Sequence, residues 1–137
     1  MNMSGTKTTQ VTECRGLRAR IDIRPGSTRL ALDGEIDLAA GPMLRAALDR
    51  ALEQPVPLVV IDVNNVEFCD CSGVGELARA ARTTRGLGIR LLLVGADEQL
   101  RRLIELTEAH ELLDAAVGRH ATRPAAARRR GSAQACP

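Results

Sequence analysis

The sequence contains almost no aromatic residues. Its 137 residues include no tryptophan and no tyrosine, and Phe68 is the single phenylalanine. Proteins that bind single-stranded nucleic acid stack its bases on aromatic side chains, so this class is nearly excluded. The core must instead be built from Leu, Val, Ile and Ala. Apolar residues make up 45% of the chain, and its length suits one domain with its own core.

Long apolar segments are also absent. No run approaches the roughly 20 apolar residues of a membrane-spanning helix. The first ten residues, MNMSGTKTTQ, lack the apolar stretch of a signal peptide. We therefore expect a cytoplasmic protein without membrane contact. In that compartment the four cysteines, Cys14, Cys69, Cys71 and Cys136, are expected to be thiols rather than a disulfide framework.

Acidic residues are missing from the C-terminal segment. Residues 119–137 carry five arginines and no Asp or Glu, whereas residues 1–118 hold the other 14 basic residues and all 17 acidic ones, a balance of −3. The larger part of the chain is thus mildly acidic, and we expect no direct nucleic-acid binding. The Ala-, Arg- and Pro-rich composition predicts a disordered basic tail over 118–137.

Apolar periodicity predicts alternating strands and helices. Strands are expected at 17–23, 28–34, 58–63 and 89–95, and helices at 41–54, after the segment CDCSG, and at 97–107. The first two strands should form a hairpin through the turn RPGS, and the apolar run LVVIDV should be buried on both faces.

The order of these elements predicts an α/β fold. We expect a single domain over 17–117, with a mixed sheet of four to five strands and helices packed on it. Residues 1–16 should be an N-terminal extension, irregular to about residue 14. The segment 111–117 fits a helical turn followed by a short edge strand.

The segment CDCSG, residues 69–73, stands where a strand gives way to a helix, and such positions form the functional edge of α/β folds. Ser72 has two compatible interpretations. Its hydroxyl could cap the helix, or it could be a phosphorylated serine, since a helix start offers free N–H groups and a positive dipole end. Gly73 and Gly75 would keep the helix start open to a partner.

Other chemistries fit this segment less well. Asp70 is expected to close the loop or cap the helix. A receiver-type phospho-acceptor needs a Lys on a late strand, and the single lysine is Lys7. The segment GVGELA fits the dinucleotide fingerprint weakly, because the apolar run ends nine residues before it. We expect no cofactor.

Two cysteines lie in the same segment. The pair Cys69 and Cys71 lacks a second ligand pair, so we expect no metal. Both cysteines are expected to be buried small hydrophobes, although Cys71, near the helix start, could react with oxidants.

Three segments together resemble the STAS family, in particular the bacterial anti-sigma factor antagonists. They are LDGEIDLAAGPMLRAAL, LVVIDVNNVEFCDCSGVGELARAAR and GIRLLLVGADEQLRRLIELTEAHELLD, in order within residues 17–117. In the family the second motif usually contains Asp-Ser-Ser-Gly. Its phosphorylated second serine falls on Ser72, and its aspartate on Asp70. Cys71 replaces the usual Ser or Thr, which could change kinase recognition, and Ala40 replaces a common Thr.

The resemblance implies a partner switch in transcription regulation, with no catalytic residue in this chain. The unphosphorylated protein would bind an anti-sigma factor that is a serine kinase, and so release the sigma factor. Phosphorylation of Ser72 would break the complex, and a PP2C-type phosphatase would reset it. The implied partner-binding residues are Glu35, Asp37, Asp70, Cys71, Ser72, Gly73, Val74 and Gly75. Two alternatives remain: a phosphorylation-independent STAS scaffold or regulatory module in a larger signalling complex, and a small nucleotide-dependent enzyme built on the glycine pair.

Overall fold

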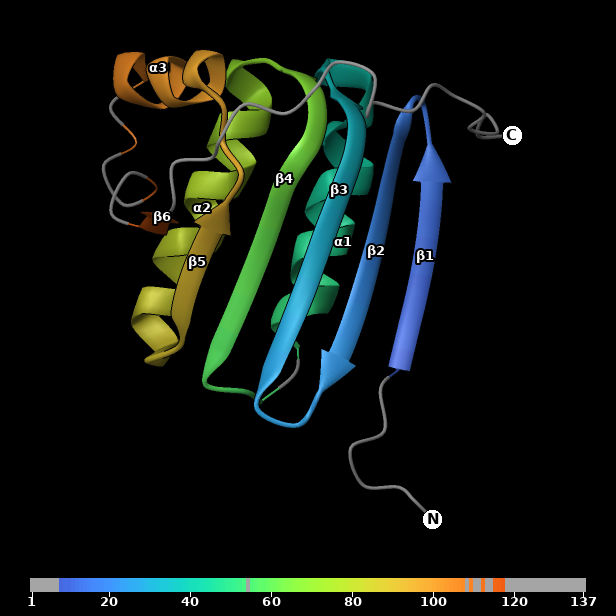
Figure 1. The fold of residues 1–137 in the computed structure, drawn as a ribbon, viewed down its shortest axis with the longest axis vertical. Coiled ribbons are helices and arrows are strands. Elements are labelled where there is room, and N and C mark those ends of the chain that lie inside the picture. The colour runs from blue at the N-terminus through green and yellow to red at the C-terminus, as the bar shows by residue number, and fades with distance from the viewer. Residues whose placement is uncertain (1–7, 54, 108, 110–111, 113–114, 118–137) are drawn as a thin grey trace.

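The computed structural model describes residues 8–53, 55–107, 109, 112 and 115–117, and shows a sheet with helices on one face (Figure 1). The elements in chain order are β1 (Thr8–Cys14), β2 (Leu17–Arg24), β3 (Ser27–Ile36), the 3-10 turn η1 (Leu38–Ala40), α1 (Gly41–Leu52), β4 (Leu58–Cys69), α2 (Cys71–Leu87), β5 (Arg90–Val94), α3 (Glu98–Leu106) and β6 (Ala116–Val117). The α/β class, the mixed sheet and the helices packed on it are confirmed. The basic tail expected over 118–137 lies outside the described residues.

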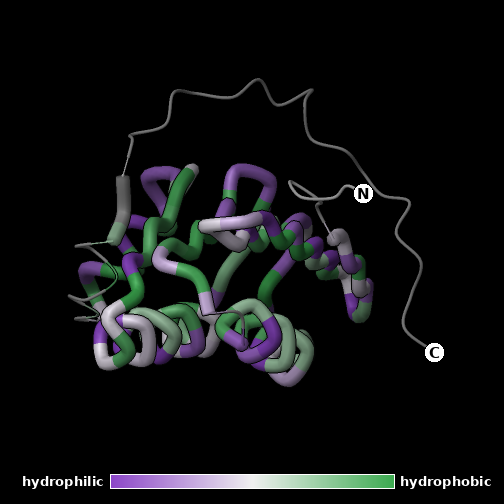
Figure 2. Tube along the Cα trace, turned by 90° about the horizontal axis from the view of Figure 1, so that it is seen from below, coloured by the Kyte–Doolittle hydropathy of each residue, from purple (hydrophilic) through white to green (hydrophobic). Residues whose placement is uncertain are grey.

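The strands lie side by side in the order in which they occur in the chain, from β1 to β6. β1, β2 and β3 are antiparallel, whereas β3, β4, β5 and β6 run parallel. Successive right-handed crossovers that move in one direction put their helices on the same face of a sheet. Figure 2 accordingly shows α1 and α2 together on one side of the strands.

An aliphatic core fills the space between the sheet and these two helices. Alternate residues of β2, β3 and β4 point into it, among them Ile21, Leu30 and Ile61, and α1 and α2 contribute Leu44, Leu48, Val74 and Leu77. The expectation that residues 58–63 are covered on both faces is wrong. Helices cover one face, and Val60 and Asp62, which alternate with the buried residues, are only half-buried.

Two strands differ from the sequence-based expectation. Residues 8–14 were expected to be irregular but form β1, which pairs with β2 along its whole length. Its side chains are mostly polar and exposed, so backbone pairing defines this strand without an apolar alternation. β4 continues to Cys69 rather than ending at Val63, with register shifts against β3 that interrupt the period-two pattern. The expected hairpin of β2 and β3 and the short edge strand β6 are confirmed.

The cysteines also differ in part from the expectation. Cys69 and Cys71 are free thiols. Cys14 is disulfide-bonded, so the expectation of a thiol is wrong there. Cys136 lies outside the described residues.

Candidate functional site

The candidate site lies where β3 and β4 end side by side. Ile36 and Cys69 are register partners at the ends of these parallel strands. The N–H of Asp70 donates to the carbonyl oxygen of Ile36 at 3.1 Å and so ties the loop after β4 to the end of β3. The structure thereby brings the end of β3, with Glu35 and the following Asp37, next to the start of α2, with Asp70 to Ser72.

Asp70, not Ser72, caps α2. Asp70 has an extended backbone conformation, and its Oδ1 accepts the N–H of Gly73 at 3.1 Å. Ser72 is already the second residue of the helix, where a side chain is not placed to cap it. The capping interpretation of Ser72 is therefore wrong, and that of Asp70 is confirmed. Asp37 and Asp97 cap η1 and α3 in the same way.

The Ser72 side chain is exposed and held in one orientation. Its hydroxyl donates to Asp70 Oδ1 at 2.7 Å. Partial burial raises the pKa of Asp70, but the hydrogen bonds from Ser72 and from the N–H of Gly73 lower it more, so the net pKa lies below its usual range. Asp70 is thus ionised at neutral pH, and Ser72 presents its oxygen to solvent beside a fixed negative charge.

The two free cysteines occupy different environments. Cys71, the first residue of α2, is exposed, so the expectation that it is buried is wrong. Cys69 is half-buried at the end of β4. Burial first, and then the nearby charge of Asp70, raises the pKa of the Cys69 thiol to about 12. Cys69 is therefore uncharged at neutral pH and behaves as a small apolar side chain.

The two glycines of the motif have different roles. Gly73 is buried, and a Cβ there would lie 2.5 Å from Ile36 Cγ2 and 2.8 Å from Cys69 Sγ. Gly75 is exposed, and a Cβ there would meet nothing within 4 Å. Both lie inside α2 rather than in a loop before it. Gly73 therefore serves close packing of helix on strand, and this arrangement disfavours the dinucleotide interpretation even though β4 reaches closer to the glycines than expected.

The residues proposed for partner binding divide into two groups. Glu35, Cys71, Ser72 and Gly75 are exposed, and Asp37 and Asp70 are partly exposed. Gly73 and Val74 are buried, Val74 in the core. These two support the surface from below and do not form it.

Two exposed apolar side chains next to the site were missed by the sequence reasoning. Leu38 in η1 is 75% exposed, and Phe68 near the end of β4 is 51% exposed. Phe68 is the register partner of Glu35, so these two residues lie side by side near the ends of β3 and β4. In the sequence both look like ordinary core residues. One signal in the sequence is that Phe68 follows NNVE, which contains three polar residues and lies beyond Val63, the expected end of the strand.

Within the described residues, no helix is long and apolar enough to cross a bilayer. The same part of the chain holds no group of three or more His, Cys, Asp or Glu residues placed to bind a metal ion.

Comparison with known proteins gives consistent matches. The STAS domain family model matches residues 18–122. The anti-sigma-B factor antagonist of Listeria monocytogenes is 28% identical over 81 residues, which cover 59% of this chain and 71% of that protein. The corresponding antagonist of Bacillus subtilis is 25% identical over 100 residues, 72% of this chain and 91% of that one.

A solved structure agrees with these matches. The crystal structure of an anti-sigma factor antagonist from Mycobacterium paratuberculosis is 26% identical and covers 79% of this chain and 83% of its own, with a TM-score of 0.57. The family model spans well over half of the sequence, and the fold is similar to that of this solved antagonist. The chain therefore belongs to the STAS domain family and is related to the anti-sigma factor antagonists.

Proposed function

We propose that this protein is an anti-sigma factor antagonist that binds an anti-sigma factor with serine kinase activity and is switched off by phosphorylation of Ser72. The observation that carries the proposal is the exposed Ser72 hydroxyl, which α2 does not need for its cap because Asp70 supplies it. Because Ser72 does not cap the helix, it can be modified without unfolding the helix. The relatives named as anti-sigma-B factor antagonists support the same assignment.

Surface chemistry around Ser72 fits a protein partner. Leu38 and Phe68 offer apolar contact area, and Glu35, Asp37 and Asp70 supply negative charge close by. Exposed apolar side chains bordered by charged ones are typical of protein–protein contacts. Basic groups on the anti-sigma factor would complement the acidic residues.

Phosphorylation of Ser72 would change this surface by electrostatics. A phosphoserine carries close to two negative charges at neutral pH. The new charge would lie close to the ionised Asp70, because the Ser72 oxygen that would carry the phosphate is now 2.7 Å from Asp70 Oδ1. In the complex these two neighbouring negative charges would have to lose their hydration, or the phosphate would face acidic groups of the partner, and either effect opposes binding. The N–H groups at the start of α2 would tolerate the phosphate, so the switch would act by repulsion and leave the fold intact.

The cycle also needs a phosphatase and a compartment. We propose that a PP2C-type phosphatase removes the phosphoryl group and that the cycle operates in the cytoplasm.

The first test is the intact mass of the protein after incubation with ATP and a lysate of its own bacterium. The wild type should gain one phosphoryl group, and Ser72→Ala should gain none. Cys71→Ser, which changes the neighbouring residue to the hydroxyl usual in the family, should be modified like the wild type. If Ser72→Ala is still modified, or the wild type is not modified at all, the proposed switch is wrong.

The second test uses affinity capture of the anti-sigma factor by the purified protein. Ser72→Asp should lose the captured kinase, whereas Ser72→Asn, which has a similar size without the charge, should keep it. Equal capture by both variants would favour the phosphorylation-independent scaffold.

A further inference from the structure

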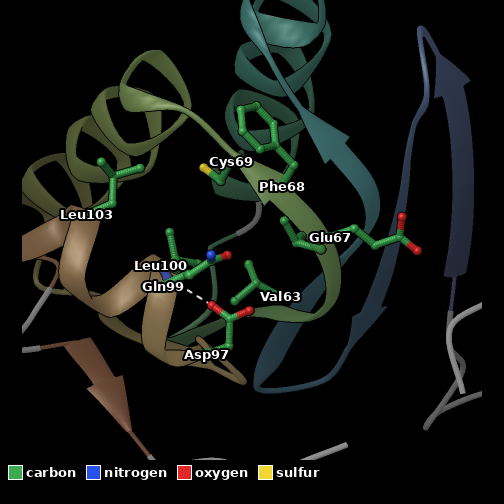
Figure 3. A pocket seen from close by; sticks show the side chains of 9 residues that line it. Val63, Glu67, Phe68, Cys69, Asp97, Gln99, Leu100 and Leu103 are labelled. Atoms are coloured by element: carbon green, nitrogen blue, oxygen red, sulfur yellow. Dashed lines mark hydrogen bonds between the residues drawn. The ribbon is translucent and has the colours of Figure 1, made fainter. Parts of the chain in front are cut away.

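A pocket lies between the end of β4 and α3 (Figure 3). β5 pairs with β4 only along Leu58–Asp62. In the described part of the chain, the later half of β4 therefore has no strand on this side, and α3 passes beside it instead. The space left between strand and helix is about 250 Å³. This is smaller than the roughly 300–1,000 Å³ of drug-sized ligand sites, so it suits a single side chain better than a large ligand.

The pocket has an apolar wall and an acidic rim. Val63, Leu100 and Leu103 form much of the wall, together with the uncharged Cys69. Asp97 and Glu67 are the charged residues of the lining. Figure 3 shows the Glu67 side chain extending away from the other lining side chains, which leaves Asp97 as the acidic group of the pocket.

Asp97 can accept further hydrogen bonds. Its Oδ1 accepts the N–H of Leu100 at 2.9 Å. A carboxylate has about four acceptor positions, so the helix cap leaves capacity for another donor. The lining includes no basic residue.

We infer that this pocket receives a lysine or arginine side chain of the anti-sigma factor partner. Such side chains combine a long apolar stem with a cationic head. The stem would lie on Leu100 and Leu103, and the head would reach Asp97 at the edge. This charge complementarity identifies the occupant as basic rather than purely apolar.

The pocket is continuous with the Ser72 surface, and the inference in this respect rests on the proposed function. Cys69 lines the pocket, Asp70 follows it, and Asp70 Oδ1 accepts the Ser72 hydroxyl. A partner that covers Ser72 would therefore also cover the mouth of this pocket. The basic side chain would add affinity and help to orient the partner on this surface without contacting Ser72.

A direct test that needs no partner is a titration of the isotope-labelled full chain, followed by NMR. The probe is N-acetyl-arginine amide, and the matched neutral probe is N-acetyl-citrulline amide. The arginine probe should cause saturable shifts at the amides of Val63, Leu100 and Leu103, and the citrulline probe should bind about tenfold more weakly.

Two variants test the role of the Asp97 charge in this titration. Asp97→Asn, which keeps a capping side chain, should lose the preference for arginine. Glu53→Gln, an exposed acidic residue at the end of α1, should keep it. Equal binding of both probes, or no saturable shift, would overturn the inference.

A second test uses the complex and separates this inference from the proposed function. Gln99 is an exposed residue of the pocket lining. Gln99→Lys would place a competing cation at the pocket and should weaken capture of the anti-sigma factor by about tenfold, whereas Gln99→Glu should not. If Ser72→Asp abolishes capture and Gln99→Lys does not, the pocket inference is wrong and the phosphorylation switch stands. If Ser72→Asp has no effect, the switch is wrong, and the arginine titration alone decides the pocket.

Discussion

The Ser72 hydroxyl donates a 2.7 Å hydrogen bond to Asp70 Oδ1, and the same oxygen accepts the N–H of Gly73 at 3.1 Å. One carboxylate oxygen therefore both starts α2 and orients the serine. A group added to Ser72 would displace the first bond and leave the second in place. The serine proposed as the modification site and the helix cap are thus adjacent but use separate hydrogen bonds, so a charge added at Ser72 is expected to alter the surface without melting the helix.

The Asp70 cap can be tested by substitution. Asp70→Ala should lower the free energy of unfolding by about 1 kcal/mol, because it leaves N–H groups of the first turn of α2 without their acceptor. Asp70→Asn should remain close to wild type, since Asn caps helices about as well as Asp. Urea denaturation followed by circular dichroism measures both. An equal loss in the two variants would show that charge, rather than capping, is what Asp70 contributes.

The two motif glycines should respond in opposite directions to alanine. Gly73→Ala should destabilise the fold by about 1–3 kcal/mol, because the added Cβ would overlap the side chains of Ile36 and Cys69. Gly75→Ala should stabilise it by about 0.5–1 kcal/mol, because the added methyl group faces open space in a helix. Thermal and chemical denaturation of the pair checks this. Two changes of the same sign would contradict the packing described for Gly73.

Gly75→Ala also tests the surface. If Gly75 keeps the helix start accessible, this variant should bind the anti-sigma factor more weakly although it is more stable. Capture experiments on the wild type and Gly75→Ala measure this difference. Unchanged capture would remove Gly75 from the partner-binding surface.

Asp62 should make the stability depend on pH. Burial raises the pKa of Asp62, but hydrogen bonds from the backbone and side chain of Asn64 and from Arg29 lower it more, and the net pKa lies below its usual range. A folded-state pKa below the unfolded one contributes stability above the unfolded value, near 4, and this contribution is lost as the pH falls through the folded value. The wild type should therefore lose more stability between pH 6 and acidic pH than Asp62→Asn. Denaturation curves at several pH values measure the difference, with Glu53→Gln as a control. Parallel curves for wild type and Asp62→Asn would refute this role.

The free cysteines should differ in reactivity. Cys71 is exposed, whereas Cys69 is half-buried and has a pKa of about 12, so very little of its reactive thiolate is present at pH 8. Iodoacetamide should therefore label Cys71 first and Cys69 far more slowly, as followed by intact mass. Cys71→Ser should lose the fast labelling, and Cys69→Ser should keep it. The reverse result would mean that Cys69 is accessible in solution.

Much of the site could be predicted because its chemistry is local. The run CDCSG placed Ser72 at a helix start and Asp70 beside it, and both positions agree with the structure. The assignment of the cap could not be made in the same way, because Asp70 and Ser72 are both good capping residues. Only the backbone conformation decides which of them precedes the helix.

The sequence by itself determined the α/β class, the hairpin of β2 and β3, and the order of the central elements, because apolar periodicity and turn residues act over a few neighbouring positions. It did not determine β1, whose polar strand is defined by its pairing with β2, or the continuation of β4 through a shift of register. Tertiary structure alone decided that Val74 is buried while Leu38 and Phe68 are exposed, and that a pocket opens where β5 ends short of β4. Burial and cavities depend on the relative lengths and the packing of elements that are distant in the chain. A local sequence pattern does not determine how such elements pack.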